Sequence, residues 1–188
     1  ENALMYLEKC LEVARESHEQ DNEGKICYKI GELYYRSEQF RKSVAYQEKY
    51  LEIIQHQMED TRKVVDEGME KTETSMKTKT MEAHASLAKC YLRMKEIELA
   101  ESHLNHYNQL AKELKIQNAQ ADSSYYLAKL FEEKGNNAKA IEFYKAYFEA
   151  AKSERPEKKN RALVDKARVT YAIAKATRNT KHAVTPAA

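Results

Sequence analysis

The stretch ADSSYYLAKLFEEKGNNAKAIEFYKAYF, residues 121–148, decides the fold of this chain of 188 residues. Its first half carries apolar residues at spacings of three and four around Leu127-Ala128, and its second half does so around Ala140. Such spacing places apolar side chains on one face of a helix. Gly135 stands between the halves, and glycine suits the left-handed residue that closes a helix. The stretch therefore predicts two helices joined by a tight turn.

The same pattern occurs at residues 83–107 and 26–51. Three registers align without gaps: Leu127-Ala128 with Leu87-Ala88 and Ile30-Gly31, Phe131 with Tyr91 and Tyr34, and Ala140 with Ala100 and Ser43. Ala88 and Ala128 are 40 residues apart, whereas Gly31 and Ala88 are 57 residues apart. One helix pair cannot bury its own apolar face, so the repetition predicts units that stack on one another.

The composition agrees with helices and excludes several classes of protein. Only 4 Gly and 2 Pro occur, which leaves too few turn residues for an all-β fold. The 32 basic residues nearly balance the 30 acidic ones, giving a net charge of +2, whereas dedicated nucleic-acid binders usually carry a strong basic excess. No apolar run approaches the ~20 residues of a membrane-spanning helix. We therefore expect an all-α protein with neither nucleic acid nor membrane as a partner.

The repeated pattern resembles the tetratricopeptide repeat (TPR) family, in which Leu-Gly/Ala and Tyr precede a turn Gly, followed by Ala and an aromatic residue. The last unit fits best, through Leu127, Ala128, Phe131, Gly135, Ala140 and Tyr144. The resemblance implies an α-solenoid of stacked antiparallel helix pairs, a TPR-like superhelix with a period of about 40 residues. It implies a fold more than a function, since such scaffolds serve many partners.

We expect residues 1–188 to form a single array cut from a longer chain. Its expected parts are the second helix of a truncated unit at 1–20, units at 23–58, 81–116 and 118–153, an insertion or helix extension at 59–80, and a degenerate or capping helix at 158–179.

Residues 59–80 have two interpretations. Apolar residues recur at helical or heptad intervals, as in a coiled coil; they are Leu51, Ile54, Met58, Val65, Met69 and Met76. One interpretation lengthens two helices into a projecting hairpin, and the other is a mobile loop around residues 70–80. The apolar stripe is more typical of a core than of a docking surface.

No residue pattern predicts catalysis, a cofactor or a metal site. His103 and His106 lie three apart on a helix, but no second pair of ligands accompanies them. Cys27 and His84 share a repeat register without a third group to orient them. The three cysteines, Cys10, Cys27 and Cys90, are far apart in the sequence and form no C-x-x-C motif. We therefore expect reduced, partly buried thiols in a cytosolic type of compartment.

The stretch Lys152–Arg168 holds seven basic and three acidic residues, a net of +4. Such a stretch could meet an acidic surface, for example of a tubulin or dynein partner, or nucleic acid. The interpretation we favour is a solvated loop between helices around Arg155-Pro156-Glu157.

The resemblance implies that a partner binds the concave face, which the first helix of each unit lines. The outward positions there predict partner-binding residues, and these are Tyr28, Glu32, Tyr35, Lys89, Leu92, Tyr125, Lys129 and Glu132. Tyrosine is a good anchor because it gives a large contact area with a polar tip. The alternative is that these tyrosines only cover a helix surface.

Capture of a chaperone C-terminus is not expected. The positions of the basic carboxylate clamp that chaperone-binding TPR domains carry hold Tyr28, Glu32, Asp122 and Tyr126 here. Asp122 would repel a terminal carboxylate.

Three short strings resemble the tetratricopeptide repeat proteins of ciliary and flagellar axonemes: AxxYLEKxLExA from Ala3, EGxxCYxIGxxY from Glu23, and VxYAIAKA from Val169. This resemblance implies a non-catalytic scaffold, one subunit of a larger cytoplasmic or axonemal assembly. Its expected partners are axonemal dynein, docking or transport subunits. The alternative is an adaptor of the Leu-Gly-Asn type in a spindle or signalling complex, although the corresponding triplets read Ile30-Gly31-Glu32, Leu87-Ala88-Lys89 and Leu127-Ala128-Lys129.

Overall fold

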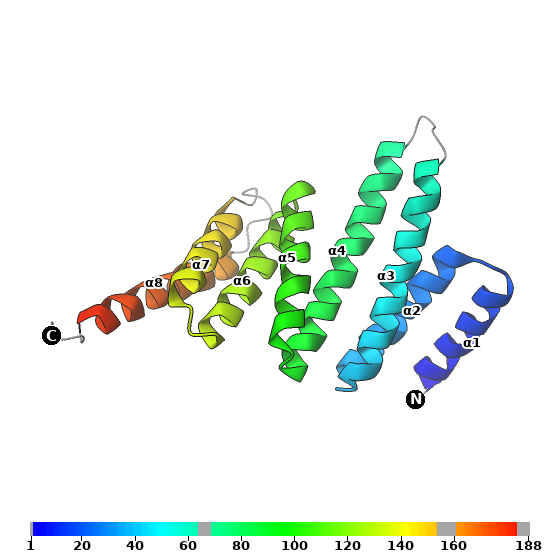
Figure 1. Ribbon diagram of the computed structural model, residues 1–188, viewed down its shortest axis with the longest axis horizontal. Coiled ribbons are helices and arrows are strands. Elements are labelled where there is room, and N and C mark those ends of the chain that lie inside the picture. The colour runs from blue at the N-terminus through cyan, green and yellow to red at the C-terminus, as the bar shows by residue number, and fades with distance from the viewer. Residues whose placement is uncertain (1, 64–68, 154–160, 184–188) are drawn as a thin grey trace. The chain divides into compact units, whose positions relative to one another are not determined.

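The computed structural model describes residues 2–63, 69–153 and 161–183, with side chains described except at 62–63, 69–70 and 178–183 (Figure 1). The helices are α1 (Asn2–Glu16), α2 (Gln20–Arg36), α3 (Phe40–Lys63), α4 (Met69–Met94), α5 (Ile97–Glu113), α6 (Gln117–Glu133), α7 (Asn137–Lys152) and α8 (Arg161–Ala183). These residues contain no strand, so the all-α prediction is confirmed. None of the helices in the described ranges is long and apolar enough to cross a membrane.

The chain forms two compact units, residues 1–106 and 107–188, and the boundary falls within α5. In the first unit α1, α2, α3 and α4 pack each on the next, and α2 also contacts α4. In the second unit α6 packs on α7, and α7 packs on α8. Within each unit, successive helices run in opposite directions (Figure 1). Each unit thus has the helix-on-helix stacking of an α-solenoid, as predicted. The expected single array over residues 1–188 and the bounds of its repeats stay predictions.

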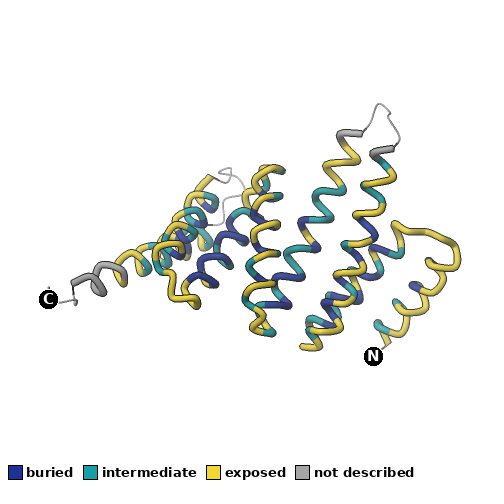
Figure 2. The backbone as a smooth tube through the Cα atoms, in the orientation of Figure 1, coloured by how far each residue is buried: buried dark blue, intermediate teal, exposed yellow. Residues whose placement is uncertain are grey.

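The repeat registers form the core of each unit. Ile30, Leu87 and Ala88 are fully buried in the first unit, and Leu127 and Ala128 are fully buried in the second. Buried residues follow the inner faces of the helices, while the outer faces are exposed (Figure 2). At about 25 cal/mol per Å² of apolar surface, burying such Leu and Ile side chains stabilises each unit by about 2 kcal/mol per residue.

Each short turn between helices closes on a residue with positive φ. Gly135 has a φ of 72°, which confirms the prediction for this glycine. Glu38, Lys95 and Lys115 take the same left-handed conformation with φ of 55–61° although they carry side chains. The amide of the residue after each one returns to the preceding helix, for example Gln39 N to Tyr34 O at 2.9 Å. These are Schellman-type helix ends, and backbone atoms alone make their hydrogen bonds.

Helices α3 and α4 are the longest, with 24 and 26 residues. Of the two interpretations for residues 59–80, the described parts are helical, since α3 reaches Lys63 and α4 begins at Met69. Met58 and Met76 pack against the core of the first unit. The Thr61 hydroxyl lies 4.0 Å from the Met76 sulfur, so the two extensions contact each other. The tip between them and the side chain of Met69 lie outside the described residues.

Candidate functional site

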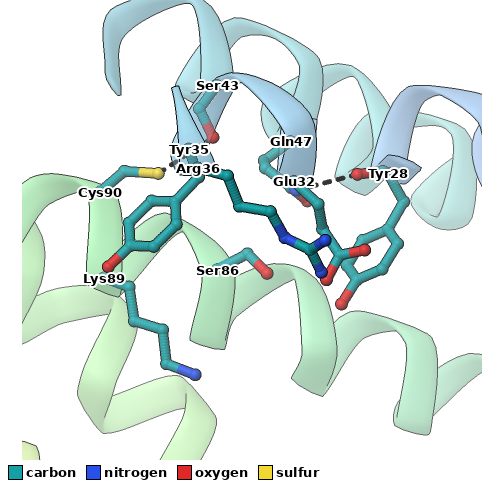
Figure 3. A pocket seen from close by; sticks show the side chains of 9 residues that line it. All are labelled: Tyr28, Glu32, Tyr35, Arg36, Ser43, Gln47, Ser86, Lys89 and Cys90. Atoms are coloured by element: carbon teal, nitrogen blue, oxygen red, sulfur yellow. Dashed lines mark hydrogen bonds between the residues drawn. The ribbon is translucent and has the colours of Figure 1, made fainter. Parts of the chain in front are cut away.

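A pocket of about 270 Å³ lies between α2, α3 and α4 in the first unit (Figure 3). Its lining comprises Tyr28, Glu32, Tyr35 and Arg36 from α2, Ser43 and Gln47 from α3, and Ser86, Lys89 and Cys90 from α4. Four of the predicted partner-binding residues are therefore brought together here: Tyr28, Glu32, Tyr35 and Lys89. Leu92, also predicted, is half-buried further along α4 and does not line this pocket.

Two tyrosines of α2 give the pocket rigid aromatic sides. The Tyr28 ring packs against Tyr50, with centroids 5.3 Å apart, and the Tyr35 ring meets the edge of Phe40 at 5.6 Å. Burial and the nearby Glu32 carboxylate raise the pKa of Tyr28, so its hydroxyl stays protonated at neutral pH. Because Tyr50 and Phe40 already hold these two rings in place, a partner that contacts them loses less side-chain conformational entropy on binding.

The floor of the pocket is polar and uncharged. The Ser43 hydroxyl donates to the Gly31 carbonyl at 2.8 Å, and the Cys90 thiol donates to the Ser43 oxygen at 3.2 Å. The Gln47 Nε2 donates to the Tyr28 carbonyl at 3.3 Å. Gln47 is fully buried, and its Oε1 has no hydrogen-bond partner among the described residues. A buried acceptor without a donor costs about 1–3 kcal/mol, so this atom is the exceptional feature of the pocket.

Charged side chains stand at the sides of the pocket. Glu32 lies 3.8 Å from the Lys29 ammonium, and Arg36 and Lys89 supply positive charge from α2 and α4. Burial, and secondly the Glu32 carboxylate, raise the pKa of Glu82 on α4. The pocket thus joins aromatic anchors, a neutral floor and charges of both signs, an arrangement typical of a surface that recognises a protein segment.

The three predicted partner-binding residues of the second unit make contacts with other residues of that unit. Tyr125 packs against Tyr147, with ring centroids 5.3 Å apart, and the Lys166 ammonium lies 5.1 Å from its centroid. Glu132 accepts hydrogen bonds from Lys129 at 3.0 Å and from the Tyr144 hydroxyl at 2.9 Å. These contacts hold α6, α7 and α8 together, so the case for Tyr125, Lys129 and Glu132 as partner-binding residues stays a prediction.

The basic stretch Lys152–Arg168 lies partly outside the described residues, including the loop around Arg155-Pro156-Glu157. In the described part, Arg168 pairs with Asp165 at 3.0 Å, and Lys166 covers Tyr125. These contacts tie two of the basic side chains to α8 and α6.

Three imidazoles meet between α4 and α5. The Nδ1 atoms of His84 and His103 are 2.9 Å apart, and the His84 and His106 rings stack with centroids at 4.8 Å. His106 Nδ1 donates to the Ser102 carbonyl, so the ring nitrogens do not converge on one point. Among the described side chains, no group of three or more His, Cys, Asp or Glu is placed to hold a metal ion. The sequence indicated only the pair His103 and His106, since His84 comes from another helix.

The cysteines differ in their surroundings. Cys27 is fully buried, and burial raises the pKa of its thiol to about 11, which keeps it protonated and unreactive. Burial also raises the pKa of Cys90. Cys10 is exposed on α1, so the expectation of partial burial is wrong for this residue.

Sequence reasoning missed the residues that make the floor, above all Gln47 and Ser43. It considered only positions facing outward from the first helix of each unit, whereas these two lie on the second helix. The signal was present in the repeat alignment. Gln47 occupies the register that holds Leu104 and Tyr144 in the other units, and Ser43 the register that holds Ala100 and Ala140.

Comparison with known proteins supports the resemblance to tetratricopeptide repeats. Residues 24–57 match the tetratricopeptide repeat family, and these residues span most of α2 and much of α3. The chain is similar to the crystal structure of BtubC (BKLC) from P. vanneervenii, with a TM-score of 0.60. That similarity covers 90% of this chain and 68% of the other at 15% sequence identity, and it shows the fold alone. No curated protein matches the chain in sequence.

The family match and the helical stacking agree on a fold built from helical repeats. The chain contains a tetratricopeptide repeat at residues 24–57, and such repeats indicate a scaffold for protein–protein interaction. A helical repeat fold of this kind is typically non-catalytic. The pocket at Tyr28 lies between the two helices of the matched repeat and the helix that follows them.

Proposed function

We propose that this chain is a non-catalytic scaffold that binds a protein segment on the α2 and α4 face of residues 1–106. The observation that carries the proposal is the pocket in which Tyr28, Glu32, Tyr35 and Lys89 come together. These residues come from the first helices of two successive helix pairs, which line the binding face in the family that the chain resembles. Stacked helices fix their spacing, so the partner is selected by shape, aromatic anchors and charge.

We further propose that the partner is an axonemal dynein, docking or transport subunit, and that the chain is one subunit of a larger assembly in a cilium or flagellum. What supports this is the similarity of the strings at Ala3, Glu23 and Val169 to tetratricopeptide repeat protein 29, which is associated with cilia and sperm flagella. The protein would then be cytoplasmic and located at the axoneme.

The binding face can be tested by exchanging two of its side chains. Tyr28→Ala with Lys89→Glu removes one anchor and reverses one charge, and it should abolish partner capture while leaving the far-UV circular dichroism unchanged. The matched control is Lys49→Glu with His56→Ala, two exposed positions on α3. Capture that survives the first pair of substitutions would place the site elsewhere on the chain.

The cellular setting needs a separate experiment. Proximity labelling from the tagged protein in a ciliated cell, read by mass spectrometry and microscopy, should mark axonemal dynein, docking or transport subunits along the cilium. The binding-face variant should lose those labels. Labelling confined to the cell cortex or the spindle would contradict the ciliary proposal and favour the Leu-Gly-Asn type of adaptor.

A further inference from the structure

We propose that the pocket of residues 1–106 binds the carboxamide side chain of an Asn or Gln carried by a protein partner, which donates a hydrogen bond to Gln47 Oε1. The inference rests on the proposed function, because it names the group that the binding face recognises. It starts from the buried side chain of Gln47, which lines the pocket and whose Oε1 has no donor among the described residues.

The orientation of the Gln47 amide is set by its surroundings. Its Nε2 lies 3.3 Å from the Tyr28 carbonyl oxygen and donates to it. Exchanging the amide nitrogen and oxygen would bring two acceptors together, which is unfavourable. Oε1 is therefore the atom left without a donor, and a partner group that satisfies it must donate.

Comparison between the repeats shows that folding does not require a polar residue here. The same register holds Leu104 and Tyr144 in the other two helix pairs, and both are 1% exposed. Leu104 fills its helix interface with apolar surface, and the Tyr144 hydroxyl donates to Glu132 at 2.9 Å, so neither leaves a polar atom without a partner. Gln47, by contrast, leaves an acceptor without a donor at a cost of about 1–3 kcal/mol. A polar residue that weakens the fold at a position where Leu suffices indicates a role in binding.

The residue opposite Gln47 is fitted to it. A Cβ atom on Gly31 would lie 2.5 Å from Gln47 Nε2, so any larger residue would displace the amide. The other repeats hold Ala88 and Ala128 at this position. Gly31 and Gln47 thus form a matched pair, which the other two units replace together.

The surroundings favour an uncharged carboxamide over other side chains. The floor consists of neutral groups from Ser43, Gln47 and Cys90, and a charge pressed against these groups would lose part of its hydration. A carboxylate could only accept hydrogen bonds and would repel Oε1. A carboxamide donates as well as accepts, so it can supply the hydrogen that Oε1 lacks. Ser86 on α4 also lines the pocket (Figure 3), and its hydroxyl interacts with the Tyr28 side chain. A volume of about 270 Å³ lies below the usual ~300–1,000 Å³ of small-molecule sites, so one side chain suits it.

The probe is a displayed library of random 12-residue peptides, selected on the full chain and, in parallel, on Gln47→Leu, which copies the residue of the neighbouring repeat. The chain should enrich peptides with Asn or Gln at one fixed position, and Gln47→Leu should lose that preference. Its melting temperature should equal or exceed that of the unaltered chain, because the acceptor without a donor is gone.

The peptides themselves give a second measurement that needs no protein variant. The best peptide is compared by fluorescence anisotropy with its Asn→Asp and Asn→Leu versions, which have nearly the same shape. Each change should weaken binding about tenfold or more to the unaltered chain, since the buried acceptor again lacks a donor. Binding to Gln47→Leu should prefer the Leu version.

Failure of the inference and failure of the proposed function give different results. Peptides that require Lys89 but bind equally with Asn, Asp or Leu would overturn the carboxamide site and keep the binding face. The same holds if Gln47→Leu selects the same peptides as the unaltered chain. Selection of no peptide, or only of peptides that ignore Lys89→Glu, would overturn the binding face and the carboxamide site together.

Discussion

Lowering the pH from 7.5 to 5.0 should destabilise residues 1–106 through the imidazole cluster of His84, His103 and His106. The 2.9 Å contact between His84 and His103 requires one Nδ1 to donate and the other to accept. Adding a proton to the acceptor brings two N–H groups together and places a charge beside a stacked third ring. The other facing groups are Tyr91, whose ring stacks on His103 at 5.4 Å, and the Glu48 carboxylate that accepts from the Tyr91 hydroxyl.

The magnitude follows from the pKa of His84. Burial, and then the other two imidazoles, lower this pKa from 6.5 to about 4. Burial also lowers the pKa of His103, and Glu48 opposes that change. Because the unfolded chain takes up the proton first, the stability is fully present above pH 6.5 and is lost as the pH falls toward 4. Linkage gives about 2 kcal/mol for His84 at pH 5, which partial solvent screening reduces to about 1–1.5 kcal/mol.

The assay is urea unfolding followed by far-UV circular dichroism at pH 7.5, 6.5, 5.5 and 5.0, at constant ionic strength. The variant His84→Gln keeps a polar side chain of similar length and removes the proton site. Its unfolding free energy should fall by about 1 kcal/mol less than that of the unaltered chain across this range. His56→Gln, an exposed position on α3, is the matched control and should follow the unaltered chain.

Two results would refute the reasoning. An unfolding free energy that is level from pH 7.5 to 5.0 would mean that the folded cluster takes up protons as readily as the unfolded chain. A pH dependence that His84→Gln and His56→Gln reduce equally would mean that the cluster has no special part in it.

Three further predictions concern single positions. Gly31→Ala should lower the unfolding free energy by about 1–3 kcal/mol, because the added Cβ would lie 2.5 Å from the buried amide of Gln47. Gly24→Ala on the same helix should raise the unfolding free energy by about 0.5–1 kcal/mol, because the nearest atoms there are 3.4 Å away. Urea unfolding measures both variants, and equal effects would contradict the close contact at Gly31. Lys115→Gly should stabilise the second unit by about 0.5–1 kcal/mol and Gly135→Ala should destabilise it, because both positions have positive φ, which favours glycine. A lower melting temperature for Lys115→Gly would show that the left-handed backbone at Lys115 is not strained. The exposed thiol of Cys10 should react rapidly with Ellman's reagent at pH 8, whereas the buried thiols of Cys27 and Cys90 should react slowly because their pKa values are raised. Cys10→Ser should therefore abolish the fast phase of the reaction. A fast phase that survives in this variant would mean that a buried thiol is accessible.

The repeat register predicted the core well because burial leaves a regular mark on the sequence. Leu87, Ala88, Leu127 and Ala128 recur in one pattern, and all four are fully buried. The left-handed turns were predictable only at Gly135. Lys95 and Lys115 take the same conformation without a glycine, since the backbone hydrogen bonds of the turn outweigh a local preference that costs only about 1 kcal/mol.

The candidate site was predicted in part, for a geometric reason. The outward positions Tyr28, Glu32 and Tyr35 follow from helical spacing, and Lys89 follows from the repeat alignment. Gln47 lies on the second helix of its pair and reaches the pocket between two helices, which periodicity on a single helix does not reveal. The contact of His84 with His103 and His106 was not predicted for the same reason, because His84 comes from a different helix.

The helix ends described above also bear on how widely sequences can differ while they keep this fold. Since backbone atoms close the turns, the residues at these corners can change in charge and size, as Glu38, Lys95 and Gly135 already do within one chain. Only a few buried positions in each helix pair then remain under structural constraint, so chains that share few residues can follow the same path. The TM-score of 0.60 at 15% identity agrees with this, since the fold is shared while few residues are. The fold of such an array is therefore recognised more surely from its backbone geometry than from sequence identity.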